Sequence, residues 1–423
     1  MINDLILQYK REKEILLGKN YVMRDKLESA RKFLDSDLIK VITGPRRAGK
    51  SVFAILLLKD KDFAYINFDD ENLLKIENQD EIIKGIFEVY KKPQFILFDE
   101  IQNLKNWELF VNKLQRRGYN LILTGSNARL LSKELATALT GRHFAIEVLP
   151  FSFNEFLRAR GLEFNRESLL LPETKGKILN TLTEFLKNGG YPEIVVKNLD
   201  TKSYLDTLFD AVLLKDVVKR YKVRFTQKIY DLALYLISNF SGEFSYNKLK
   251  NILKFNSVNT IQNYARYIEE SYLVILLNRF SYKMKEQLKS PKKIYAIDLG
   301  LIAAKSFQFS PNTGRLMENL VLVELLKKDY KPNENVFYYK TRNQKEVDFV
   351  LKDNLEIKTL IQVLYQTDDL TVEKRELKAL VEASQELNCE DLLVITWDKE
   401  GETMIKKKKI KFIPLWKWLS SSY

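Results

Sequence analysis

The stretch "VITGPRRAGKS", Val41–Ser51, decides the fold of the first part of the chain. A short β-rich run from Ile39 to Thr43 leads into a loop with two glycines, and the apolar run "VFAILLL" follows it. The order strand, loop, helix is the context in which the pattern G-x-x-x-x-G-K-[ST] binds phosphate. Backbone N–H groups of such a loop point at phosphate oxygens, and the helix N-terminus adds its positive dipole end. The sequence therefore predicts an α/β domain with a nucleotide site.

Each residue type in this loop suits a nucleotide phosphate. Gly44 and Gly49 allow the backbone to curl around the phosphates. Lys50 supplies positive charge for the β- and γ-phosphates, and Ser51 offers a hydroxyl to Mg²⁺. We therefore expect ATP and Mg²⁺ as cofactors. The loop residues expected to bind the nucleotide are Gly44, Pro45, Arg46, Arg47, Ala48, Gly49, Lys50 and Ser51.

A second apolar run ends in two carboxylates, in "PQFILFDEIQNL". Phe95–Phe98 is continuously apolar, as a buried parallel strand should be. Asp99 at its C-terminal end is expected to hold Mg²⁺ beside the nucleotide, and Glu100 to orient and deprotonate the attacking water. The alternative is a strand end with two solvated acids. The phosphate loop upstream favours the catalytic interpretation.

A third apolar run, "NLILTGSN", ends in Ser126 and Asn127. We expect Asn127 to act as a catalytic residue that contacts the γ-phosphate or the attacking water. Open α/β sheets bind their ligands at the carboxyl ends of the strands. Three apolar runs with polar residues at these ends therefore predict one site at one edge of a parallel sheet.

Five motifs, taken in order, resemble one protein family: "GPRRAGKS", "FDEIQN", "LTGSNARLL", "LTGRHFAIEVLPFSFNEFL" and "NGGYPEIV". They look like the archaeal and bacterial AAA+-related ATPases that carry a C-terminal domain of uncharacterised function, and the similarity runs over nearly the whole chain. In such ATPases the Gly-Arg pair after the third strand is similar to an arginine-finger or sensor position, which implies a catalytic role for Arg142. A guanidinium stays charged and can spread over transition-state oxygens. The alternative is that Arg142 pairs with a carboxylate, and a finger acting in trans would require oligomerisation.

Length and composition limit the class of protein. A chain of 423 residues with 45% apolar content suits two or three domains, and no run approaches the roughly 20 apolar residues of a membrane span. The charged N-terminus lacks the pattern of a secretory signal, so we expect a cytoplasmic protein with no membrane partner. One cysteine, Cys389, and one histidine, His143, leave almost no soft ligands for zinc. Any metal must therefore bind carboxylates and hydroxyls.

The middle of the chain reads as a helix, a tight turn and a second helix, in "FSYNKLKNILKFNSVNTIQNYARYIEESYLVIL". Apolar residues recur at three- and four-residue spacing and predict one buried stripe of Val258, Ile261, Ala265, Ile268 and Tyr272. The opposite face carries residue types that bind phosphates and base edges, namely Asn259, Thr260, Gln262, Asn263 and Arg266. With the basic segment that follows, the pattern predicts a winged helix-turn-helix and DNA as a partner. A net charge of +13 agrees with DNA, although it is spread among 56 acidic residues, and an interdomain scaffold is the alternative.

The last third of the chain resembles the restriction-endonuclease-like core. Glu318 lies in "GRLMENLVLVELLK", Asp348 in "NQKEVDFVL", and Glu356 with Lys358 in "LEIKTLIQV", with Gln362 four residues later. In that core, Asp and Glu bind Mg²⁺ and the Lys positions or activates the water. The resemblance implies Asp348, Glu356 and Lys358 as catalytic residues and Glu318, Asp348 and Glu356 as metal ligands, beside Ser51 and Asp99 at the first site. Oxygen ligands suit a hard cation, but alternating charges on a hairpin also arise by chance.

The sequence thus predicts an α/β multidomain protein. Its parts are a P-loop parallel-sheet ATPase domain at residues 1–160, a helical winged-helix domain at 161–305, and an α/β restriction-endonuclease-like domain at 306–423. The expected function is Mg²⁺-dependent ATP hydrolysis coupled to DNA binding or processing. The alternative is a nucleotide-switch signalling ATPase whose C-terminal domain regulates and does not cleave.

Overall fold

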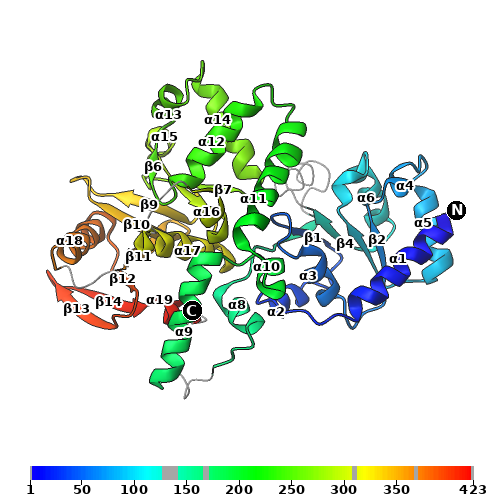
Figure 1. Cartoon of the computed structure of the whole chain (residues 1–423), viewed down its shortest axis with the longest axis horizontal. Helices are drawn as coiled ribbons and strands as arrows, with labels where there is room; N and C mark the ends of the chain where they lie inside the picture. Colours follow the sequence, from blue (N-terminus) through cyan, green and yellow to red (C-terminus); the bar gives the residue numbers. More distant parts are fainter. Residues whose placement is uncertain (1, 126–141, 165–170, 307–311, 366–369, 421–423) are drawn as a thin grey trace. The chain divides into compact units, whose positions relative to one another are not determined.

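The protein divides into two compact units, which are described separately. The computed structural model describes residues 2–125, 142–164, 171–306, 312–365 and 370–420 (Figure 1). The first unit is Met1–Phe151 and the second is Ser152–Tyr423. The first unit therefore ends before the predicted boundary at residue 160, and the two later predicted domains share one unit.

A parallel sheet forms the centre of the first unit. Its five strands have the order β2-β3-β4-β1-β5, and every neighbouring pair is parallel. The strands are β1 (Ile39–Thr43), β2 (Phe63–Asn67), β3 (Phe95–Asp99), β4 (Asn120–Gly125) and β5 (His143–Glu147). Every residue of β1 and β3 is buried, which explains the continuous apolar run Phe95–Phe98 in β3. Strand β1 also buries Lys40 and Thr43. The predicted parallel sheet is confirmed.

Helices pack against this sheet and close its core. They are α1 (Ile2–Leu17), α2 (Leu27–Arg31), α3 (Lys50–Leu57), α4 (Glu71–Leu74), α5 (Asp80–Tyr90), the 3₁₀ turn η1 (Ile101–Asn103) and α6 (Trp107–Arg116). Helix α3 contacts β1 and β4, α6 contacts β4, and α1 contacts β2 and α5. Apolar residues at three- and four-residue spacing explain the packing of α6, which buries Trp107, Phe110, Val111 and Leu114.

The second unit begins with helices. They are α8 (Phe153–Ala159), α9 (Pro172–Asn188), α10 (Pro192–Lys197), α11 (Thr201–Ala211) and the π-helical segment η3 (Val212–Lys219). Helix α9 ends at the "NGG" sequence, where Gly189 has φ +72° and a Cβ there would lie 2.0 Å from Asp298 Oδ1. The N–H of Gly190 donates to Asp298 Oδ2 at 2.7 Å. The glycine pair therefore allows the end of α9 to approach the N-terminus of a later helix.

A three-stranded antiparallel sheet with four helices follows. Its elements are α12 (Thr226–Ser238), β6 (Glu243–Phe244), α13 (Tyr246–Ile252), α14 (Val258–Glu270), β7 (Val274–Asn278), α15 (Met284–Lys289) and β8 (Lys292–Ala296). The strand order is β6-β8-β7. Ile261, Ala265 and Ile268 are buried as predicted, whereas Val258 is half-buried and Tyr272 is buried beyond the end of α14.

A six-stranded mixed sheet completes the second unit (Figure 1). Its elements are α16 (Leu299–Lys305), α17 (Thr313–Lys327), β9 (Val336–Lys340), β10 (Glu346–Asp353), β11 (Glu356–Leu364), α18 (Leu370–Leu387), β12 (Asp391–Thr396), β13 (Gly401–Ile405), β14 (Lys408–Pro414) and α19 (Leu415–Ser420). The strand order is β13-β14-β12-β11-β10-β9. Strands β11, β12 and β14 are parallel, and β9, β10 and β11 form an antiparallel meander. One apolar core joins α18 to this sheet.

Candidate functional site

The loop between β1 and α3 has the curled backbone that a phosphate needs. Gly44 has φ +142° and Gly49 has φ +90°. A Cβ on Gly44 would lie 2.0 Å from the Val148 carbonyl oxygen, so only glycine fits where the chain after β5 approaches. Arg47 at the tip has φ +62°, a conformation that a residue with a Cβ adopts at some cost. The predicted loop conformation therefore follows from the positions of the two glycines.

Lys50 is the first residue of α3, directly after this loop. Its side chain is buried, and its ammonium donates to the Pro45 carbonyl oxygen at 3.0 Å. The ammonium is 3.9 Å from Glu100 Oε1. The positive charge is thus held between the loop backbone and the catalytic carboxylate that the sequence predicts.

Asp99, at the C-terminal end of β3, receives hydrogen bonds on both carboxylate oxygens. Ser51 Oγ donates to Oδ1 at 2.8 Å, Thr124 Oγ1 also donates to Oδ1, and the Tyr65 hydroxyl donates to Oδ2 at 3.2 Å. Burial raises the pKa of Asp99 to about 6, and the neighbouring Glu100 adds to the rise, while the bonds from Thr124 and Ser51 oppose it. The two predicted magnesium ligands, Ser51 and Asp99, are therefore in direct contact.

Glu100 adopts a left-handed backbone conformation directly after β3, with φ +51°. Its N–H donates to Thr124 Oγ1 at 3.0 Å, and its side chain accepts a hydrogen bond from Gln102. Positive φ at a residue with a Cβ costs on the order of 1 kcal/mol and is often found at functional sites. The conformation turns Glu100 to the same edge of the sheet as Lys50.

Two residues of this site were missed in the sequence. Thr124 is the polar residue of β4 that links Asp99 to the backbone of Glu100. The sequence feature that could have indicated Thr124 is a hydroxyl side chain after the apolar run Leu121–Leu123. Tyr65 belongs to β2, whose place beside β3 is fixed by the strand order and not by any local motif.

Arg142 lies at the opposite edge of the sheet from the loop. The parallel register pairs Ile39 with His143, so Arg142 lies beside the start of β1, whereas the loop follows its end. Five residues of strand separate the two edges by about 16 Å. The guanidinium is 3.4 Å from Gln115 Oε1. Arg142 therefore does not reach the nucleotide site of its own chain, which corrects its expected role there. Asn127 lies outside the described residues.

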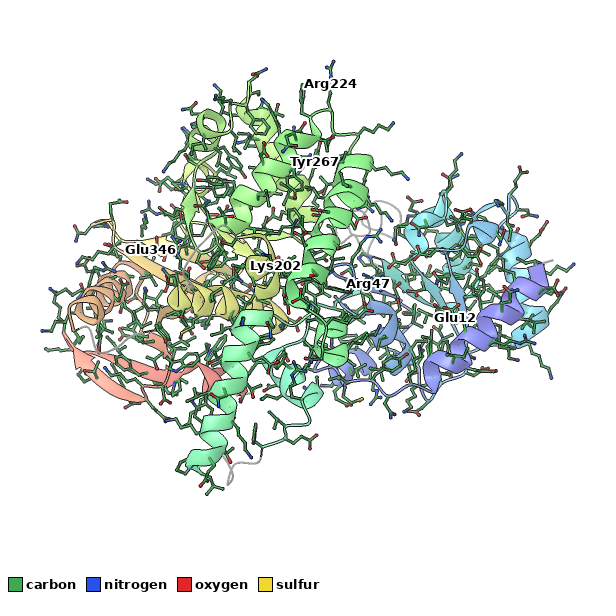
Figure 2. All side chains as sticks on the ribbon, in the orientation of Figure 1. Glu12, Arg47, Lys202, Arg224, Tyr267 and Glu346 are labelled. Carbon is green, nitrogen blue, oxygen red and sulfur yellow. The ribbon has the colours of Figure 1, made fainter. Side chains whose placement is uncertain are left out.

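A second cluster of charges lies in the second unit. The ammonium of Lys293, on β8, is buried and lies 2.7 Å from Glu318 Oε1, 2.6 Å from Glu346 Oε1 and 3.2 Å from Asp348 Oδ1. The hydroxyl of Tyr295 donates to Glu318 at 2.6 Å. Figure 2 labels Glu346 at the start of β10. The structure therefore brings Glu318 and Asp348 together, as expected, but around a lysine that the sequence did not indicate.

Burial changes the protonation of this cluster. It raises the pKa of Asp348 well above its usual range, and the negative charge of Glu318 adds to the effect. Burial alone would lower the pKa of Lys293, but Glu318, Tyr295 and Asp348 raise it well above its usual range. Lys293 is therefore the charged cation at the centre of these acids.

Glu356 and Lys358 do not join this cluster. They lie at the exposed turn end of the β10–β11 hairpin, where Lys358 Nζ is 2.6 Å from Glu356 Oε2. Register pairs Phe349 with Ile361, so Asp348 lies opposite Gln362, six residues and about 20 Å beyond Glu356. Asp348 N–H donates to Gln362 Oε1 at 3.4 Å, and Val363 N–H donates to Asp348 Oδ2 at 2.9 Å. The expected site of Glu318, Asp348, Glu356 and Lys358 is therefore not assembled.

The hairpin turn explains this difference. Asn354, with φ +54°, and Leu355 form the turn, and Asp353 pairs with Glu356. The neutral Gln362 thus lies beside Asp348, where an acid was expected. Among the residues that the structure describes, no group of three or more His, Cys, Asp or Glu side chains could hold a metal ion.

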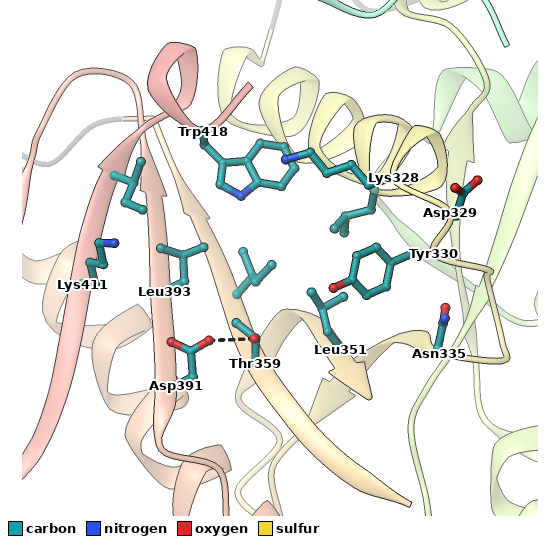
Figure 3. Close-up of a pocket in the computed structure, with 13 residues that line it drawn as sticks. Lys328, Asp329, Tyr330, Asn335, Leu351, Thr359, Asp391, Leu393, Lys411 and Trp418 are labelled. Carbon is teal, nitrogen blue, oxygen red and sulfur yellow. Dashed lines mark hydrogen bonds between the residues drawn. The ribbon is translucent and has the colours of Figure 1, made fainter. Parts of the chain in front are cut away.

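A ligand-sized cavity of about 410 Å³ lies elsewhere in the second unit (Figure 3). Aliphatic side chains of β10, β11, β12 and β14 line it, together with Tyr330 and Trp418. The Lys328 ammonium is 4.5 Å from the centre of the Trp418 ring, and the only hydrogen bond drawn joins Thr359 to Asp391. The cavity brings together none of the predicted site residues.

No helix in the described part of the chain has the length and apolar character to cross a membrane.

Comparisons with known proteins give three family matches along the chain. A family described as "AAA domain" matches residues 36–157. Two families described as domains of unknown function, DUF8612 and DUF4143, match residues 179–311 and 313–418. The candidate nucleotide site lies within the AAA domain, which identifies residues 36–157 as an ATPase-type domain.

Two relatives match over nearly their whole length. An uncharacterized protein of Methanocaldococcus jannaschii is 39% identical over 96% of this chain and 96% of its own. An uncharacterized protein of Haemophilus influenzae is 30% identical over 85% of this chain and 90% of its own. Among solved structures, a Walker-type ATPase of Pyrococcus abyssi is similar over 68% of this chain and 99% of its own, with 13% identity and a TM-score of 0.44. The chain belongs to the protein family of the two uncharacterized relatives, and it is a member with an AAA domain at residues 36–157.

Proposed function

We propose that the protein is a Mg²⁺-dependent ATPase that couples ATP hydrolysis to DNA binding and whose C-terminal domain regulates without cleaving. The observation that carries the ATPase is the meeting of Lys50, Ser51, Asp99 and Glu100 at one edge of the parallel sheet of an AAA domain. DNA is the partner that agrees best with the exposed lysines of the second unit.

The residues present fit a nucleotide with Mg²⁺. The Ser51 hydroxyl and the Asp99 carboxylate are hard oxygen donors that already touch, at 2.8 Å. Both would hold the ion, which would neutralise the phosphate charge. The loop N–H groups bind the phosphates, and Lys50 can exchange its bond to the Pro45 carbonyl for phosphate oxygens.

Glu100 is the residue placed to act on water. Its side chain is only partly buried, and its carboxylate is 3.9 Å from the Lys50 ammonium. A carboxylate beside the γ-phosphate site orients a water and accepts its proton. Thr124 holds the Glu100 backbone through its N–H, so the position of the base depends on β4.

The order of elements from α12 to β8 supports a winged helix-turn-helix. A helix, a short strand and two helices are followed by two strands with the short helix α15 between them, and the sheet order is β6-β8-β7. In this fold the third helix, here α14, is the one that enters the major groove, and the hairpin after it is the wing. Asn259, Gln262 and Asn263 are exposed on α14. They are residue types that read base edges.

The wing supplies the positive charge. Lys285 and Lys289 are exposed on α15, between β7 and β8. Arg266 suits DNA less well than the sequence indicated, since it lies 3.7 Å from Glu270 and over the ring of Tyr267, which Figure 2 labels. The phosphate contacts are therefore assigned to the wing and not to Arg266.

Charge reversal of the wing tests DNA binding. We expect Lys285→Glu with Lys289→Glu to weaken DNA binding and to reduce the salt slope by about two, because each phosphate contact releases one counterion. The matched control is Lys374→Glu with Lys378→Glu on α18, which changes the net charge equally on exposed residues. Equal loss of affinity in both variants would indicate only a net-charge effect and would contradict the assignment.

The acidic cluster of the C-terminal domain supports the absence of cleavage. The Lys293 ammonium lies among Glu318, Glu346 and Asp348, where a nuclease of the expected kind would need a metal ion. Gln362 beside Asp348 is a weaker metal ligand than a carboxylate. We expect no cleavage of linear, nicked or branched DNA in Mg²⁺ or Mn²⁺. Cleavage that disappears in Asp348→Ala would contradict this expectation.

A protein partner is the second candidate for the wing. Tyr282, Met284 and Leu288 are exposed there by 72%, 68% and 67%. Exposed apolar side chains close together favour contact with a protein. The test compares two variants for activation of ATP hydrolysis by a protein partner. If Met284→Ser with Leu288→Ser abolishes this activation while Lys285→Glu with Lys289→Glu does not, the nucleotide-switch function is favoured. A second copy of the chain could also supply Arg142 as an arginine finger, which would require an oligomer.

A further inference from the structure

Tyr65 is a buried tyrosine whose hydroxyl reaches the expected magnesium ligand. Only 2% of the residue is exposed, and its hydroxyl donates to Asp99 Oδ2 at 3.2 Å. A buried hydroxyl without a partner is costly, and bonds to charged groups are among the stronger ones. The contact is therefore a defined part of the site and not an incidental approach.

The strand register explains how Tyr65 reaches this position. Strand β2 lies beside β3 in parallel, and Tyr65 pairs with Leu97, two residues before Asp99. Two residues of strand advance about 6.6 Å, which the long tyrosine side chain spans. A shorter polar side chain at this position would not reach the carboxylate.

The two oxygens of Asp99 have separate partners. Oδ1 accepts from Ser51 and Thr124, whereas Oδ2 accepts from Tyr65. Ser51 is the other expected magnesium ligand, so Oδ1 is the oxygen that already faces it. Of the two Asp99 oxygens, Tyr65 bonds to Oδ2, so it fixes the plane of the carboxylate without occupying Oδ1.

Neighbouring aromatic and acidic side chains hold Tyr65 in turn. The ring of Tyr9, on α1, meets it edge to face with centroids 6.4 Å apart. The Tyr65 N–H lies 3.5 Å from the Tyr90 hydroxyl. Glu12, which Figure 2 labels on α1, competes with Asp99 for the single hydroxyl proton of Tyr65. The tyrosine is thus fixed from two helices, α1 and α5.

We infer that Tyr65 is a positioning residue for Asp99, which orients the carboxylate toward Ser51 and the magnesium ion and joins α1 to the metal site. The inference deepens the proposed function and rests on its Mg²⁺ dependence. The hydroxyl of Tyr65 bonds to Asp99, and its role in the site is exerted through that carboxylate.

Titration of Mg²⁺ against Tyr65→Phe tests the inference. Binding of ATPγS is measured by calorimetry in EDTA and at increasing Mg²⁺ concentration. We expect the half-saturating Mg²⁺ concentration to rise about tenfold in Tyr65→Phe, as for loss of one bond to a charged group. Affinity in EDTA should stay at its wild-type value, because Phe keeps the ring contacts and Tyr65 acts through the metal ligand Asp99.

Tyr9→Phe is the matched control. It also removes one buried tyrosine hydroxyl, but this hydroxyl donates to Asp70 at 3.0 Å and not to Asp99. It should leave the Mg²⁺ titration unchanged. The inference is overturned if Tyr65→Phe titrates like the wild type, or if it loses affinity equally in EDTA. A wild-type protein that binds ATPγS equally with and without Mg²⁺ would instead contradict the Mg²⁺-dependent function itself.

Discussion

Lys50 and Glu100 lie 3.9 Å apart but are expected to act at different stages of the reaction. Lys50 neutralises phosphate charge in the bound nucleotide and in the transition state alike. Glu100 acts on the water only while the bond to the γ-phosphate breaks. Measurements of ATP affinity and of hydrolysis rate on variants of each residue therefore distinguish the two roles.

We predict that Lys50→Ala abolishes ATP binding, whereas Glu100→Gln keeps binding and lowers the hydrolysis rate by at least about 100-fold, the size typical for loss of a general base. Calorimetry gives the affinity, and phosphate release gives the rate. Equal loss of affinity in the two variants would contradict the assigned roles.

Asp298 gives a prediction of pH dependence. Burial raises its pKa from 3.8 to about 6, despite hydrogen bonds from the N–H groups of Gly190 and Gly300 that lower it. The folded state therefore binds this proton more readily than the unfolded state. Below roughly pH 4 Asp298 is protonated in both states and does not change the free energy of unfolding. As the pH rises toward 6, its ionisation in the unfolded state lowers the free energy of unfolding increasingly, and above that the loss is about 3 kcal/mol.

Urea unfolding of the wild type and of Asp298→Asn between about pH 4 and pH 7.5 would measure this pH dependence of the free energy of unfolding. The free energy of unfolding of the wild type should fall relative to the variant as the pH rises through this window. A difference between the two that does not change with pH would show that Asp298 does not carry the effect.

Strand β8, helix α17 and strand β10 meet at Lys293. Each contributes to one buried cluster, through Lys293, Glu318, and Glu346 with Asp348. Removal of one partner from a buried ion cluster leaves the other charges without compensation. The cluster therefore joins the three-stranded sheet to the six-stranded sheet within the second unit.

We predict that Lys293→Met lowers the stability of the second unit by about 3–5 kcal/mol, the range for breaking a buried ion pair. Lys358→Met is the control, because Lys358 is exposed at the hairpin end. It should leave the thermal midpoint unchanged. A Lys293→Met protein as stable as the wild type would contradict the role of the cluster.

The sequence predicted those features of the molecule that depend on local pattern. The glycines of the loop, the apolar run of β3 and the acids at its C-terminal end required only neighbours along the chain. Tyr65 and Lys293 could not be found in this way, because each depends on strands that pair across the fold. The motif of Arg142 does not show that the residue precedes β5 and lies away from the nucleotide site of its own chain. The turn at Asn354 was the one local signal that would have set the hairpin register and paired Asp348 with Gln362.

For the whole chain, the central claim is that DNA and ATP hydrolysis are coupled. The most direct measurement is the steady-state rate of phosphate release in Mg²⁺ as duplex DNA is added, for the wild type, Glu100→Gln, and Lys285→Glu with Lys289→Glu. We predict that DNA raises the wild-type rate several-fold, that the wing variant keeps the basal rate but loses the stimulation, and that Glu100→Gln hydrolyses slowly in both conditions. A wild-type rate that DNA does not change, at a concentration that saturates binding, would contradict the account.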